Sequence, residues 1–147
     1  MKIETTILKN LLQNEDYARK VLPFLNDEYF TENSDKIIYN QINNFILKYN
    51  SLPNKEALNI ELSEAKITEE DFKESVNLIN EIGKDDQEFS DLSWLLDTTE
   101  KFCQDKAIYN AVVESISILD NPKSTADKGT IPDILSDALS VSFDPHV

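Results

Sequence analysis

Only two of the 147 residues are glycine, Gly83 and Gly129, and only five are proline. A β-sandwich or β-barrel needs a turn about every 8–12 residues, and glycine and proline supply many of the backbone conformations of such turns. A chain so poor in both is predicted to be all-α, with long helices joined by a few breaks. Apolar residues make up 40% of the chain, which is enough for a core and argues against wholesale disorder.

The first part of the chain, residues 1–83, is predicted to be a globular helical head. Apolar residues recur there at helical spacing, and the clearest stripe consists of Ile38, Ile42, Phe45 and Tyr49. A second helix of this part carries Phe72, Val76, Ile79 and Ile82. The expected N-terminal caps are Asn14, Asn33 or Ser34, and Thr68, and Gly83 is expected to end the last helix of the head. The aromatic residues of segment 23–30 are expected to pin it to the core.

An acidic loop at residues 84–90 leads into the longest periodic stretch, about residues 91–120. At 100° per residue its apolar residues fall on two faces. One face holds Leu95, Phe102, Tyr109, Val112, Val113, Ile116 and Leu119, and the other holds Leu92, Leu96, Cys103, Ala107 and Ile118. A surface helix normally needs one apolar stripe. Two stripes predict two packing partners, of which one could be a helix of the same chain and the other a second subunit.

A polar break from Asn121 to Gly129 separates this stretch from a last helix. Thr130 is its expected cap, with Pro132 and Asp133 in the first turn. Two helices joined by a short polar segment make an αα-hairpin, predicted here for residues 91–143. Residues 144–147 are expected to begin a linker to a further domain that this chain does not include.

Apolar side chains exposed on such a hairpin mark a protein interface. The candidates for subunit contact are Phe102, Tyr109, Val113, Ile116, Leu135, Leu139 and Phe143. Some of them must pack within the hairpin instead, and the sequence does not divide the two groups.

The residues offer no set for covalent chemistry. A phosphate-binding loop, Gly-x-x-x-x-Gly-Lys-[Ser/Thr], needs two closely spaced glycines, and Gly83 and Gly129 lie far apart. The only histidine is His146, near the end of the chain, and the only cysteine is Cys103, on an apolar stripe. One histidine and one cysteine form no zinc site. We therefore predict no catalytic residues, no bound metal and no cofactor in this chain.

The acidic loop is also a candidate calcium site. Asp85, Asp86, Glu88 and Asp91 could in principle collect the ion, but the spacing and the turn glycine of an EF-hand are absent. A solvated acidic loop before a helix N-terminus explains these residues through the helix dipole.

The net charge of −14, from 28 acidic and 14 basic residues, bears on partners and location. Binding to nucleic acid requires clustered lysine and arginine, so this chain is predicted not to bind DNA by itself. No apolar run approaches the roughly 18–20 residues of a membrane span, and the first residues do not form a signal peptide. With its single cysteine, the chain is predicted to be cytosolic and not to contact a membrane.

Four segments together resemble one family. They are PFLNDEYF at 23–30, SLPNKEALN at 51–59, SWL at 93–95 with TEKF at 99–102, and GTIPDIL at 129–135 with ALSVSFD at 138–144. In this order and spacing they are similar to the amino-terminal domain of the replicative DNA helicase of T-even-like bacteriophages, a branch of the DnaB-type hexameric helicases. The likeness covers nearly the whole chain, although the break between Asp120 and Gly129 is shorter than the family pattern.

The resemblance implies a helical head and a hairpin that pairs with a neighbouring subunit, building a collar of dimers in a hexamer. It implies contact with primase and with a helicase loader during DNA replication. ATP, Mg²⁺ and translocation on single-stranded DNA would belong to a motor domain after residue 147. The expected location is the cytoplasm of the infected bacterial host.

Two alternatives remain from the residues alone. A free-standing acidic phage protein could mimic DNA and bind a host nucleic-acid-binding protein, which the charge of −14 would suit. However, mimicry requires arrayed carboxylates, and here lysines interrupt the acids, as at Lys73 beside Glu74. An enzyme with an unfamiliar pair of acids would require two convergent carboxylates in one pocket.

Overall fold

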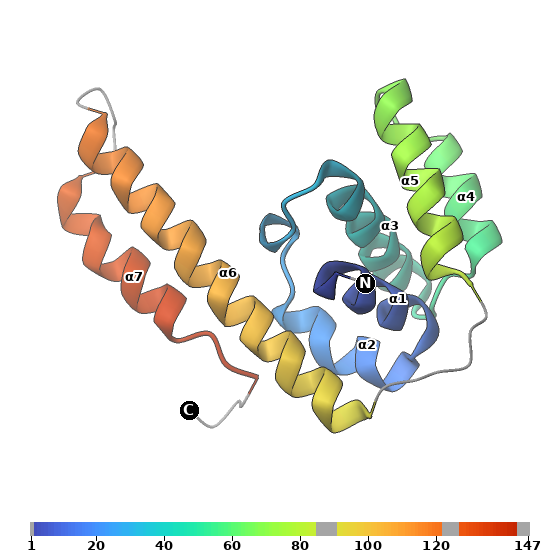
Figure 1. Ribbon diagram of the computed structural model, residues 1–147, viewed down its shortest axis with the longest axis horizontal. Helices are drawn as coiled ribbons and strands as arrows, with labels where there is room; N and C mark the ends of the chain where they lie inside the picture. Colours follow the sequence, from blue (N-terminus) through green and yellow to red (C-terminus); the bar gives the residue numbers. More distant parts are fainter. Residues whose placement is uncertain (1, 85–90, 122–126, 144–147) are drawn as a thin grey trace. The chain divides into compact units, whose positions relative to one another are not determined.

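The structure is a computed structural model that describes residues 2–84, 91–121 and 127–143. These three stretches consist of α-helices and short 3₁₀ turns with no β-strand among them, so the predicted all-α fold is confirmed (Figure 1). Asp85, Asp86, Glu88, the middle of the polar break and the tail with His146 lie outside the described residues. The chain divides into two compact units, Met1–Leu95 and Leu96–Val147.

Residues 2–84 of the first unit form five helices and two 3₁₀ turns. The helices are α1 (Ile3–Gln13), α2 (Glu15–Val21), α3 (Asn33–Tyr49), α4 (Lys55–Ser63) and α5 (Glu69–Ile82), and the turns are Leu22–Phe24 and Asp27–Tyr29. Helix α3 packs against α1, α4 and α5, while α1 also packs against α2 and α5. The helix α3 is therefore the central element of this unit.

The core of the first unit is formed by the apolar faces of its helices. Its fully buried aliphatic residues include Ile7, Leu8, Leu11, Ile38, Ile42, Leu58, Leu62, Ile79 and Ile82. Each such side chain contributes about 1.5–3 kcal/mol through its removal from water. The predicted stripes reach this core only in part, because Tyr49 and Phe72 lie at the outer ends of α3 and α5 and are exposed.

Two of the predicted helix caps are confirmed. The Asn14 side chain accepts a hydrogen bond from the Tyr17 amide at 3.1 Å, and the Thr68 hydroxyl accepts one from the Asp71 amide at 3.1 Å. The cap predicted for α3 is wrong. Asn33 already belongs to the helix, the preceding residue Glu32 makes no capping hydrogen bond through its side chain, and Ser34 is buried in the first turn.

The segment between α2 and α3 is held on the core, as its aromatic residues predict. Phe30 is only 1% exposed, and its ring centroid lies 5.4 Å from that of Tyr39. The Tyr39 hydroxyl in turn donates a buried hydrogen bond of 3.0 Å to the Leu25 carbonyl oxygen. The aromatic pair and this hydrogen bond thus help to hold a stretch that has no long helix of its own.

The second unit is a helical hairpin. Helix α6 (Leu92–Asp120) begins at the end of the first unit, and a 3₁₀ turn (Lys128–Thr130) precedes α7 (Ile131–Leu139), which packs along α6 (Figure 1). Thr130 occupies the N-cap position of α7, as predicted, but its backbone is already helical and its side chain makes no capping hydrogen bond. The Asp127 side chain starts the turn instead, accepting a hydrogen bond from the Gly129 amide at 3.1 Å.

Candidate protein-interaction surfaces

An apolar surface covers one side of α6 in its second half. It consists of Ile108, Tyr109, Val112, Val113, Ile116 and Leu119, which are between 37% and 65% exposed. At 100° per residue these six positions fall within an arc of about 140°, and every residue of the arc between 108 and 119 is apolar. We call this surface the exposed apolar face of α6.

The opposite side of α6 is covered within the hairpin. Ala111, Ser115 and Ile118 are buried there, and the Ser115 hydroxyl donates a hydrogen bond to the Ala111 carbonyl oxygen at 2.8 Å. On α7, Ala138 is buried as well. Of the second apolar stripe predicted for this helix, Cys103 and Ile118 are buried, whereas the exposed apolar face is not covered by any of the described residues.

Two hydrogen bonds tie the residues after α7 to α6. The Gln104 side-chain amide donates to the Val141 carbonyl oxygen at 3.0 Å, and the Phe143 amide donates to the Glu100 carboxylate at 2.6 Å. Glu100 and Gln104 lie on the same side of α6 as Ala111 and Ser115. These bonds keep α7 on that side of α6, and the exposed apolar face stays open.

The structure separates the seven predicted interface residues. Tyr109, Val113 and Ile116 on α6 and Leu139 on α7 are exposed, Leu135 and Phe143 are half-buried, and Phe102 is buried. The Lys106 ammonium lies 5.9 Å from the centroid of the Phe102 ring. Ile108 was not predicted, although its spacing from Val112, Ile116 and Leu119 is the signal that could have identified it.

Cys103 is a structural residue. It is fully buried, and burial, with a smaller effect of the neighbouring Glu100 carboxylate, raises the pKa of its thiol to about 12. The nucleophilic form of cysteine is the thiolate, which is scarce at neutral pH when the pKa is this high. The interpretation of Cys103 as a small hydrophobic residue is therefore supported.

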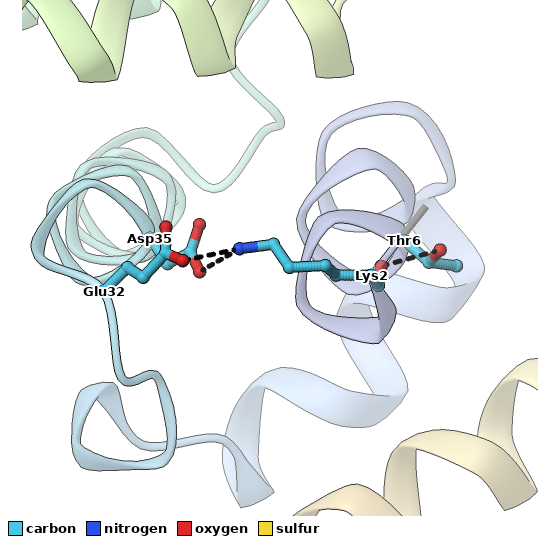
Figure 2. A network of polar contacts seen from close by, with 4 residues as sticks. All are labelled: Lys2, Thr6, Glu32 and Asp35. Atoms are coloured by element: carbon cyan, nitrogen blue, oxygen red, sulfur yellow. Dashed lines mark hydrogen bonds and ion pairs between the residues drawn. The ribbon is translucent and has the colours of Figure 1, made fainter.

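A charged cluster lies in the first unit, where the beginnings of α1 and α3 meet. The Lys2 ammonium reaches the Glu32 carboxylate at 3.1 Å and the Asp35 Oδ2 atom at 3.8 Å (Figure 2). Asp35 is only 2% exposed, and burial raises the pKa of its carboxyl above the ordinary value of 3.8, against the opposing effect of Lys2. The hydrogen bond to Glu32 is the main cause that raises the pKa of Lys2.

Asp35→Asn is expected to stabilise the protein near neutral pH. A carboxyl with a raised pKa in the folded state binds its proton more tightly when folded, so its contribution to stability is lost as the pH rises through the folded pKa. The charged Asp35 then destabilises the fold, and asparagine removes that charge. Urea unfolding over a pH series should show that the variant has a higher free energy of unfolding than the parent, and that this difference shrinks toward zero below the Asp35 pKa. A stabilisation that does not depend on pH would contradict this account. So would an equal stabilisation by the control substitution Asp97→Asn, which removes an exposed carboxylate.

Two further kinds of site are absent from residues 2–84, 91–121 and 127–143. Within these ranges, no group of three or more histidine, cysteine, aspartate or glutamate side chains is placed to hold a metal ion. None of the helices in this part of the chain combines the length and the apolar character that a membrane crossing requires.

Comparison with known proteins identifies a relative of this chain. No family model matches the chain. It is 34% identical over 149 residues to a DnaB-like replicative helicase of Enterobacteria phage T4, and the alignment covers 96% of this chain and 31% of the helicase. The chain therefore spans about a third of the length of that relative. This similarity confirms the resemblance drawn from the four sequence segments.

Proposed function

We propose, from the homology of this chain to the N-terminal part of a DnaB-like replicative helicase, that it is the assembly and docking domain of a phage replicative DNA helicase. In this proposal residues 1–83 form the head, residues 91–143 form the pairing hairpin, and the chain catalyses no reaction itself. Residues 144–147 lead toward a motor domain that would bind ATP and Mg²⁺.

The observation that supports pairing is the exposed apolar face of α6. Six large apolar side chains without an intervening polar residue form a continuous patch, and such patches mark protein–protein contacts. Covering them stabilises an assembly by roughly 25 cal/mol for each Å² of apolar surface removed from water. Leu139 on α7 is a further exposed apolar side chain of the hairpin.

The proposed occupant of this face is the hairpin of a second copy. Dimers of identical chains commonly use one self-complementary patch around a two-fold axis, and an apolar helix face meets this requirement. Three such dimers would form the collar of a hexamer. Tyr109, Val113, Ile116 and Leu139 are the proposed contacts, because they are the exposed members of the seven predicted interface residues.

The remaining partners are proposed from the family. Primase and a helicase loader would dock on this domain, and DNA would be bound by the motor domain, because a net charge of −14 repels phosphate. The complex would act in the cytoplasm of the infected host. The coding sequence after Val147 is expected to contain a phosphate-binding loop, and a stop codon directly after Val147 would contradict the helicase assignment.

Self-association of the chain tests the pairing. Sedimentation equilibrium is expected to show a monomer–dimer equilibrium with a dissociation constant on the order of 10–100 μM, since the motor ring would raise the effective concentration in the whole protein. A strict monomer at the highest concentration that stays in solution would count against the hairpin as a pairing surface.

A further inference from the structure

A polar cavity of about 260 Å³ opens on the first unit, between the beginnings of α1 and α3 and the outer side of α5. Its lining includes the charged residues Lys2, Glu32, Asp35, Glu74 and Glu81, together with Asn77. This cavity shares no residue with the exposed apolar face of α6. It is therefore a separate candidate site.

The lining of the cavity is strongly acidic. Four carboxylates face one ammonium group, and that ammonium, on Lys2, is engaged with Glu32 at 3.1 Å and Asp35 at 3.8 Å. Glu74 and Glu81 both project from α5 and are exposed, and no cation of the described residues forms an ion pair with either. The cavity thus has an excess of negative charge that its own lysine does not neutralise.

One oxygen of the deepest of these carboxylates lacks a hydrogen-bond donor. Asp35 is 98% buried, and its Oδ2 atom has no hydrogen-bond partner among the described residues, because Lys2 at 3.8 Å is too distant to donate one. Buried polar atoms in native proteins nearly always have a hydrogen-bond partner, so an acceptor held only by a long ion pair with Lys2 points to a missing donor. The half-exposed Lys2 side chain can stay on Glu32 while another donor approaches Asp35.

We propose that this cavity binds an arginine side chain of a partner protein. A guanidinium group is planar, permanently charged and carries five N–H donors, so it can pair with Asp35 and with the free carboxylates of α5 at the same time. A lysine offers a single point of charge and suits this spread of acceptors less well. The absence of three ligands placed around one point, within the described residues, disfavours a metal ion as the occupant.

Titration of the ¹⁵N-labelled chain with a blocked Gly-Arg-Gly peptide tests the site by NMR. Saturable shifts are expected for amides at the beginnings of α1 and α3 and along α5, with a dissociation constant on the order of 1 mM. The peptide with citrulline in place of arginine keeps the shape without the charge and is expected not to bind. Equal binding of the citrulline or lysine peptide would overturn the proposal, as would displacement of the arginine peptide by Ca²⁺ at equal concentration.

Two variants separate the cavity from the general negative charge of the protein. Asp35→Asn is expected to weaken binding of the arginine peptide about tenfold, and Glu81→Gln about threefold. Glu69→Gln removes the same charge from α5 outside the cavity and is expected to leave the affinity unchanged. Equal affinities for all three variants would overturn the assignment. Hairpin pairing does not enter this measurement, so its outcome is independent of the proposed function.

Discussion

Ile116→Glu is expected to weaken self-association of the chain about a hundredfold. Ile116 lies near the middle of the exposed apolar face of α6 and is 52% exposed. In a symmetric dimer the substitution would place two like charges in an apolar contact, where an unpaired charge is costly. A hundredfold change corresponds to about 2.8 kcal/mol, within the range of an interface hot spot. Sedimentation equilibrium of the parent and the variant measures it directly.

The matched control for this prediction is Ser117→Glu. It adds the same charge to the same helix one residue away, and Ser117 points about 100° from Ile116, outside the apolar arc. This variant is expected to associate nearly as the parent does. If both substitutions weaken association equally, general repulsion explains the result; if neither does, a different surface makes the dimer. Circular dichroism of both variants checks that the hairpin remains helical.

The helix pattern was largely predictable because helices depend on local sequence. Asn14 and Thr68 cap helices as predicted, since a short polar side chain needs only the amide three residues later. The capping hydrogen bonds predicted at the starts of α3 and α7 do not form. At α3 the cause is tertiary packing, and at α7 it is a competing local interaction. Ser34 lies buried in the first turn of α3. At α7, the Asp127 side chain starts a 3₁₀ turn, and Thr130 makes no capping hydrogen bond to the helix that follows.

The interface was harder to predict than the fold, because periodicity gives the direction of a side chain and not what covers it. Phe102 and Tyr109 lie two turns apart on nearly the same side of α6. Nevertheless, Phe102 is buried while Tyr109 is 65% exposed. The position along the helix decides whether such a side chain is buried or exposed. This outcome depends on which parts of α6 other residues cover, and the spacing of apolar residues does not predict that.

The acidic cavity was not predicted at all. In the sequence, Asp35 is an acid in the first turn of a helix. This arrangement is common, because the helix dipole stabilises a negative charge near the N-terminus. Its burial arises only when α1 and α3 come together and Lys2 reaches across to it (Figure 2). A charge that is kept in the interior although its pKa is raised costs stability, and such costs are often associated with binding.

Phe30→Ala is expected to lower the free energy of unfolding of the first unit by about 3–5 kcal/mol, the largest effect predicted for a single substitution in this chain. Phe30 is only 1% exposed, and its ring packs against Tyr39. Its removal leaves a cavity beside the Tyr39 hydroxyl that holds the Leu25 carbonyl. Because the segment between α2 and α3 has no other long element, it has little means of closing the space.

Urea unfolding followed by circular dichroism measures this effect, with Phe72→Ala as the control. Phe72 lies on α5 but is 36% exposed, so its truncation removes a similar side chain from a partly solvated position and is expected to cost less than about 1.5 kcal/mol. Equal losses for the two variants would mean that Phe30 does not anchor the segment. A decrease in the free energy of unfolding that is large only for Phe30→Ala would indicate that the Phe30 ring, packed against Tyr39, holds residues 22–30 on the core.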